Sequence, residues 1–191
     1  MEIWMVIAIA AVLVIVIVAL VMLRMKAQHQ RQGTERLQQK FGSEYESAVT
    51  DAGRKKGEAD LEGREERVAG FELRPLSASE AERFTGLWTA AQARFVDDPG
   101  GAISDADSLL SEVMQARGYP VSDFEQRADD ISVNHAEFVG NYRAAHAAAA
   151  KHSRGETSTE DLRRAMVNYR WLFTDLVAQD DRQPEAQAPR A

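Results

Sequence analysis

The chain contains no cysteine, and this absence removes several kinds of chemistry at once. Disulfide bonds, thiolate zinc sites and cysteine nucleophiles are all excluded. A lipid anchor attached to a cysteine is excluded for the same reason. The absence agrees with a reducing compartment such as the cytoplasm.

The sequence also lacks the short motifs that mark common active sites. It has no G-x-S-x-G nucleophile motif, no phosphate loop, no dinucleotide fingerprint and no H-E-x-x-H metal motif. The aspartates between residues 97 and 107 do not follow the order of an EF-hand loop. His135 and His146 would lie about 16 Å apart along a helix, too far to bind one ion. We therefore expect no catalytic activity, no cofactor and no metal.

Basic residues are outnumbered over most of the chain. The whole sequence has 23 Lys and Arg against 30 Asp and Glu, a net charge of −7. Residues 1–40 hold five basic and two acidic residues, so residues 41–191 carry a balance of −10. Nucleic-acid binding depends largely on Lys and Arg contacts with phosphates. So acidic a surface argues against a nucleic-acid partner.

One long hydrophobic run stands out at the N-terminus, where residues 3–23 carry no charge. A helix of that length spans roughly 30 Å, the thickness of a bilayer's hydrocarbon core. The run is longer than a signal-peptide core, no Lys or Arg precedes it, and no small-residue cleavage site follows it. We expect a single transmembrane helix that is retained, with Trp4 as an interfacial anchor.

The segment after this run is basic, which predicts an orientation. Basic residues near the end of a span stay on the cytoplasmic side. We therefore expect the N-terminus outside and the body of the chain in the cytoplasm. The same side chains would contact anionic lipid, at about 1 kcal/mol per basic residue. They are Arg24, Lys26, Arg31, Arg36 and Lys40.

Residues 24–74 predict a basic juxtamembrane segment followed by a polar helical stalk. A short apolar stripe includes Leu37, Phe41 and Tyr45, and apolar residues become scarce after it. Pairs such as Asp60–Arg64 support a helix weakly. Four glycines, at 53, 57, 63 and 70, each weaken it by up to ~1 kcal/mol. We expect an exposed, interrupted helix.

Residues 75–178 predict a compact bundle of about five helices. Ser77 with Glu80 is a capping box, and Asp98 precedes a proline at the first helical position. Ser122 with Glu125 is a second capping box, and Thr157 or Ser158 is expected to cap the last helix. The five expected helices occupy residues 77–95, 98–118, 122–131, 135–152 and 158–176, with a break at 132–134. No stretch alternates with period two, so the expected fold class is all-α.

The expected apolar faces of these helices follow the helical repeat. The first face includes Phe84, Leu87, Trp88, Ala91 and Phe95, and the fourth includes Tyr142 and His146, which we place in or near the core. Residues 179–191 have no apolar face and contain two prolines, so we expect a disordered tail.

Three segments of the soluble part resemble a known bacterial family. They are FGSEYESAV, RFVDDPGGAISDADSLLSEVMQARGYPVSDFEQRADDISVNHAEFVGNYRAAH and STEDLRRAMVNYRWLF. The family comprises membrane-anchored helical proteins of actinobacteria and proteobacteria, to which no activity is assigned. The resemblance covers about residues 36–177 and implies the domain limits and a bacterial inner membrane. Some members are labelled secreted, whereas the basic flank here favours a cytoplasmic domain.

One group of residues is a candidate binding site, because arginines and tyrosines flank the expected core positions. One interpretation is internal ion pairing with Glu125, Asp129, Asp130 or Asp161. The other is a cationic pocket between helices that binds an anionic ligand or a partner's carboxylates. The candidate residues are Arg94, Arg127, Tyr142, Arg143, Arg163, Tyr169 and Arg170.

Two functions follow from these patterns. The first is a membrane-tethered helical adaptor without catalytic activity, which binds a protein partner beside the bilayer. The second is a helical sensor or enzyme that holds a small anionic ligand in the arginine- and tyrosine-lined pocket. A pocket of arginines without carboxylate partners would favour the second.

Overall fold

The computed structural model of the chain describes residues 20–22, 24–25, 28 and 31–178. Every regular element in this part is a helix, which confirms the all-α fold class. The chain divides into two compact units, Met1–Lys40 and Phe41–Ala191. In the first unit, residues 31–40 are helical. All the labelled helices belong to the second unit.

The predicted membrane span cannot be compared with this structure, because most of residues 3–23 lie outside the described part. The same holds for Lys26 and for the predicted tail, residues 179–191. Among the residues that are described, no helix has the length and apolar character needed to cross a membrane. The span, its orientation and its lipid contacts therefore stay predictions.

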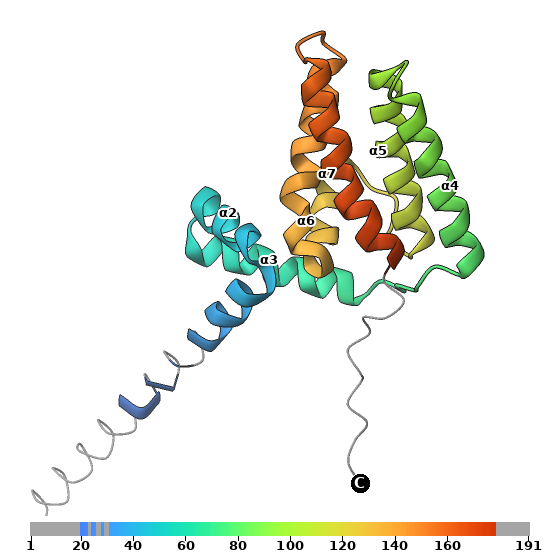
Figure 1. Ribbon diagram of the computed structural model, residues 1–191. Helices are drawn as coiled ribbons and strands as arrows, with labels where there is room; N and C mark the ends of the chain where they lie inside the picture. The colour runs from blue at the N-terminus through green and yellow to red at the C-terminus, as the bar shows by residue number, and fades with distance from the viewer. Residues whose placement is uncertain (1–19, 23, 26–27, 29–30, 179–191) are drawn as a thin grey trace, which may run out of the picture. The chain divides into compact units, whose positions relative to one another are not determined.

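The predicted bundle consists of α4 (Ala78–Arg94), α5 (Pro99–Ala116), α6 (Phe124–His152) and α7 (Thr159–Ala178). These helices run alongside one another and form the four-helix body (Figure 1). Its core combines buried apolar residues of all four helices. Trp88 of α4 is buried there and stacks on Phe173 of α7 at 4.7 Å between ring centroids. Leu87, predicted on the same face, is 43% exposed instead.

Local sequence signals place most of the helix ends. The Ser77 hydroxyl accepts from the Glu80 N–H, and the Glu80 carboxylate accepts from the Ser77 N–H, as a capping box requires. The Asp98 carboxylate accepts from the Gly101 N–H at the start of α5. Ser158 caps α7 through the N–H of Asp161. These caps confirm three of the predicted helix starts.

Helix α6 differs from the prediction at two places. Its cap is Asp123, whose carboxylate accepts from the Gln126 N–H, and not Ser122. The predicted break at residues 132–134 is a kink within one long helix, with non-helical backbone angles at His135. The two expected helices therefore join, and the body has four helices where we expected about five.

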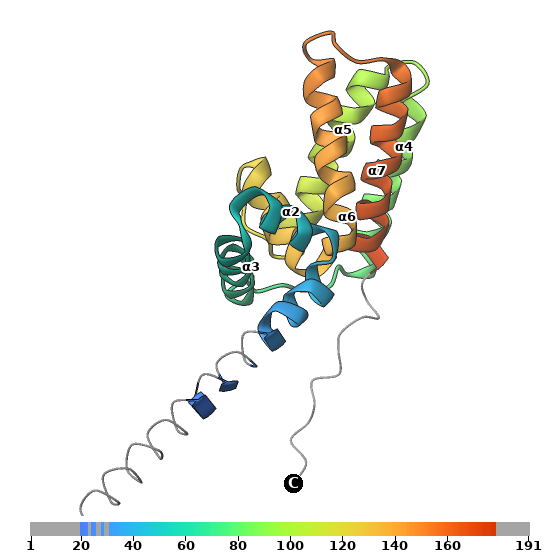
Figure 2. The same ribbon diagram turned by 90° about the vertical axis from the view of Figure 1, so that its left-hand side faces the viewer.

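The structure differs more from the prediction in the segment that we expected to be an exposed stalk. Residues 43–69 form a helical hairpin there. The hairpin consists of α2 (Ser43–Ala52) and α3 (Arg54–Ala69), and both helices pack against α6 (Figure 2). The compact unit begins at Phe41 and not at the predicted boundary, Pro75. The apolar stripe supplies buried side chains here, since Phe41 and Tyr45 are almost fully covered.

Two of the glycines that we expected to weaken a stalk helix instead allow the hairpin to form. Gly53 has a φ of +78°, which glycine adopts readily, and its N–H donates to Val49 O at the end of α2. A Cβ atom on Gly57 would lie 2.7 Å from Ala48 O. The close approach of α2 and α3 therefore requires a residue without a side chain at position 57.

Replacement of Gly57 tests this packing against a matched glycine of the same helix. Gly57→Ala should lower the free energy of unfolding, because the added methyl group meets backbone of α2 that cannot rotate away. Gly63→Ala should raise it by up to ~1 kcal/mol, because nothing lies within 4 Å and alanine favours a helix. Denaturant unfolding of both full-length variants measures the difference. Equal effects of the two substitutions would contradict the close packing of α2 on α3.

Candidate functional site

The seven predicted site residues do not gather in one place. Arg94, at the end of α4, pairs with Asp98 at 2.6 Å and with Asp105 of α5 at 2.7 Å. These carboxylates belong to the same domain, and all three side chains are about half exposed. The pairing joins the turn between α4 and α5 and leaves no free cation at this position.

Two further arginines lie on the exposed side of α7. Arg163 pairs with Glu160, three residues earlier, at 2.8 Å. Arg170 is exposed, and the described residues provide no ion-pair partner for it. Within the described residues, neither side chain forms a hydrogen bond or an ion pair with another predicted site residue.

Tyr142 and Tyr169 form a buried contact between α6 and α7. Their ring centroids lie 6.0 Å apart, and both side chains are fully covered. The Tyr169 hydroxyl donates to Asp107 of α5 at 2.9 Å, and Arg127 Nε donates to the Tyr142 hydroxyl at 3.4 Å. Burial raises the pKa of both phenols, and the nearby charge of Asp107 adds to the effect. Both tyrosines therefore stay neutral, Tyr169 as a hydrogen-bond donor and Tyr142 as an acceptor, and they join three helices of the body.

His146 borders this contact, in agreement with its predicted place in or near the core. Its ring stacks on Phe124 with 3.6 Å between centroids. Its Nδ1 lies 3.5 Å from an Asp107 oxygen, and its side chain is 35% exposed. The histidine therefore packs at the edge of the core beside a carboxylate.

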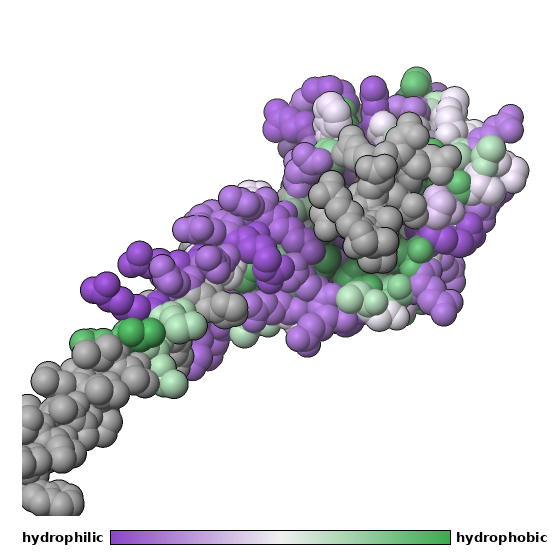
Figure 3. Space-filling model, turned by 90° about the horizontal axis from the view of Figure 1, so that it is seen from below, coloured by the Kyte–Doolittle hydropathy of each residue, from purple (hydrophilic) through white to green (hydrophobic). Residues whose placement is uncertain are grey.

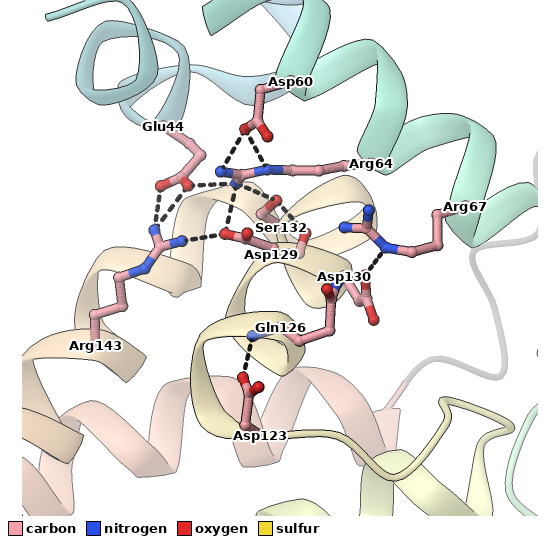
Figure 4. Close-up of polar contacts among 10 residues, drawn as sticks. All are labelled: Glu44, Asp60, Arg64, Arg67, Asp123, Gln126, Asp129, Asp130, Ser132 and Arg143. Atoms are coloured by element: carbon pink, nitrogen blue, oxygen red, sulfur yellow. Dashed lines mark hydrogen bonds and ion pairs between the residues drawn. The ribbon is translucent and has the colours of Figure 1, made fainter. Parts of the chain in front are cut away.

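Arg143 points toward Glu44 of the hairpin and Asp129 of α6 (Figure 4). Its guanidinium donates to both oxygens of Glu44 in α2, at 2.6 and 2.7 Å, and to Asp129 at 2.8 Å. Asp129 is one of the partners that the sequence suggested for these arginines. Glu44 was not foreseen, because 99 residues separate it from Arg143.

Arg64 of α3 completes the connection between the hairpin and α6. Its Nη1 atom lies 2.8 Å from Glu44 and 3.0 Å from Asp129, and donates to Ser132 at 3.3 Å. Its other nitrogens bind Asp60, the helical neighbour noted in the sequence. Only 10% of the Arg64 side chain and 7% of the Glu44 side chain are exposed.

A second arginine of α3 makes a parallel contact one turn further along. Arg67 Nε donates to Asp130 Oδ1 of α6 at 2.7 Å, and Gln126 Nε2 donates to the same oxygen at 2.8 Å (Figure 4). We call these side chains together the ion-pair network. Its members are Glu44, Asp60, Arg64, Arg67, Asp129, Asp130 and Arg143.

Burial and charge oppose each other inside the network. Burial raises the pKa of Asp129, although Arg64 and Arg143 act to lower it. Burial also lowers the pKa of Arg143, but its hydrogen bond to Glu44 and the charges of Glu44 and Asp129 outweigh this, so the pKa is raised. Both partners are desolvated, and the ion pairs outweigh this cost for Arg143, whereas burial outweighs them for Asp129. The arrangement connects α2 and α3 to α6 through ion pairs.

A buried pair at the kink of α6 was also missed. His135 Nδ1 hydrogen-bonds the Asp175 carboxylate of α7, and both side chains are almost fully buried. The sequence placed His135 only at a helix start. The contact joins the kink to the last turns of α7.

Metal binding finds no support in the described part of the chain. It contains no group of three or more His, Asp or Glu side chains arranged to hold an ion.

Comparison of the chain with family models, with curated proteins and with solved structures found no match. The resemblance to bacterial membrane-anchored proteins therefore stays a prediction.

The buried tyrosines predict how stability depends on alkaline pH. Burial raises the pKa of all four, Tyr45, Tyr119, Tyr142 and Tyr169, above the usual value of about 10. Their contribution to stability is therefore complete below pH ~10 and is lost as the pH rises through the folded-state values. Tyrosinate absorbance should appear together with loss of the helical circular dichroism signal. Tyrosinate formed at the usual pH in a fully helical protein would contradict their burial.

Proposed function

We propose that this chain is a single-pass membrane-tethered helical adaptor that binds a protein partner and has no catalytic activity. Residues 3–23 would cross a bacterial inner membrane with the N-terminus outside. Residues 41–178 would then lie in the cytoplasm, and the basic residues between 24 and 40 would contact anionic lipid. The uncharged run and its basic flank support this arrangement.

The observation that carries the proposal is the pairing of the candidate arginines with carboxylates of the same chain. Arg94, Arg143 and Arg163 all make short ion pairs within their own domain. A cation that is already paired offers less to a small anionic ligand. The pairing therefore disfavours the sensor at these positions. Of the two functions, the adaptor that binds a protein partner is favoured.

Arg127 is the residue that still favours the alternative. It is half-buried beside Tyr142, and no carboxylate in the described part lies within ion-pair distance of it. However, the charge of Asp107 acts on the same tyrosines. A negative charge beside these tyrosines opposes the binding of an anion there.

The surface of the domain is suited to selective docking. Hydrophilic side chains cover most of the described surface seen in Figure 3, with smaller hydrophobic patches among them. Trp171 of α7 is 56% exposed and Val167, one turn before it, is 43% exposed. Exposed tryptophans are enriched among the residues that dominate protein–protein binding. A membrane anchor would also raise the local concentration, so a weak contact could suffice.

Proximity labelling in living cells tests this proposal. A labelling enzyme fused to the C-terminus should repeatedly enrich one cytoplasmic or membrane protein. Trp171→Ala should abolish that enrichment, because it removes an exposed ring without opening the core. Arg164→Ala, an exposed substitution on the same helix, should leave it unchanged.

Two results would contradict the proposal in different ways. Enrichment of proteins from outside the cytoplasm would overturn the orientation. A profile equal to that of an unrelated single-span protein, together with a small metabolite that raises the melting temperature of the chain, would favour the sensor.

A further inference from the structure

The hydrophobic core of the four-helix body does not include the buried apolar residues of the hairpin. The core of the four-helix body contains side chains of α4, α5, α6 and α7, and none from the hairpin. The hairpin has its own buried residues, which include Tyr45, Leu61 and Val68. The body therefore has a hydrophobic core that contains no side chain of the hairpin.

The segment between the hairpin and α4 is attached to the body independently. The Arg74 N–H donates to Arg117 O at 2.9 Å, and Phe71 packs edge-on against Tyr119. Leu76 belongs to the core of the body. The hairpin can therefore move about Gly70, the C-cap residue of α3, while the segment after it and α4 stay in place.

The contacts that cross from the hairpin to α6 are strongly ionic. Glu44 and Arg64 lie on the hairpin, whereas Asp129 and Arg143 lie on α6, and these four side chains alternate in charge. Arg67 and Asp130 add a second ionic contact. The attachment of the hairpin to α6 therefore depends on the charges of these side chains. The core of the body consists of apolar side chains and does not depend on them.

We propose that the ion-pair network is a releasable latch, and that the hairpin detaches from α6 as one piece while the four-helix body stays folded. Gly53 and the close packing at Gly57 keep α2 and α3 together during release. The helices have 10 and 16 residues, about 15 and 24 Å in length. Release therefore gives the chain an extensible arm before the body. The latch does not depend on the adaptor function or on a membrane.

Pulsed electron paramagnetic resonance on the full-length protein tests the latch. Because the chain has no cysteine, two introduced cysteines carry spin labels at chosen positions only. One pair, Glu62→Cys with Glu137→Cys, joins the hairpin to α6, and a second pair, Glu46→Cys with Glu62→Cys, lies within the hairpin. All three positions are exposed and take no part in the ion-pair network.

Loss of the central ion pair should release the hairpin. Arg143→Met should add a population with longer distances for the hairpin–α6 pair and leave the distances within the hairpin unchanged. Arg163→Met removes an ion pair inside α7 and should change neither pair. Unchanged hairpin–α6 distances in Arg143→Met would overturn the latch, and so would broadening of both pairs, which means that the hairpin unfolds.

A salt series on the unsubstituted network provides an independent test. Raising the ionic strength from about 0.1 M to about 1 M shortens the screening length from roughly 10 Å to roughly 3 Å. The longer-distance population of the hairpin–α6 pair should grow with salt, while the circular dichroism of the helices stays constant. A salt-induced change of the distances within the hairpin, or a loss of helical circular dichroism, would show that the hairpin unfolds instead of detaching, and would overturn the proposal.

Discussion

Glu44 lies between two arginines, and the position of the hairpin depends on this carboxylate. Arg64 reaches it from α3 and Arg143 reaches it from α6, so one side chain of α2 connects three helices. A buried carboxylate requires such partners, because an unpaired charge away from water is costly. Removing either arginine therefore leaves Glu44 poorly compensated. The pairing of Glu44 with Arg143 places α2 on α6, and the contacts of Arg64 with Asp129 and of Arg67 with Asp130 place α3 there.

The rest of the unit obeys a different constraint. In the four-helix body, stacked and edge-packed rings such as Trp88 on Phe173 fill a continuous core, which favours a compact bundle in any ionic environment. Ion pairs within a protein often add little net stability, because desolvation offsets their attraction. Their geometry does select one arrangement among several, and the network here selects the site at which the hairpin lies.

The contrast between local and distant contacts explains how much could be predicted from the sequence. The caps at Ser77, Asp98 and Ser158 depend on residues three positions away, so the sequence contains the whole signal. The hairpin depends on Glu44 meeting Arg143 across 99 residues, which no local pattern reveals. Helix propensity predicts only that Gly53 weakens a helix. Its positive φ instead places it in the turn between α2 and α3.

The coupling between Glu44 and Arg143 tests the central claim most directly. Denaturant unfolding of the wild type, Glu44→Gln, Arg143→Met and the double variant gives a double-mutant cycle for this pair. Residues that share an ion-pair network couple by roughly 0.5–3 kcal/mol, and we expect a favourable coupling of ~1 kcal/mol or more. A coupling near zero, with additive effects of the two substitutions, would contradict the view that this ion pair fixes the hairpin on α6.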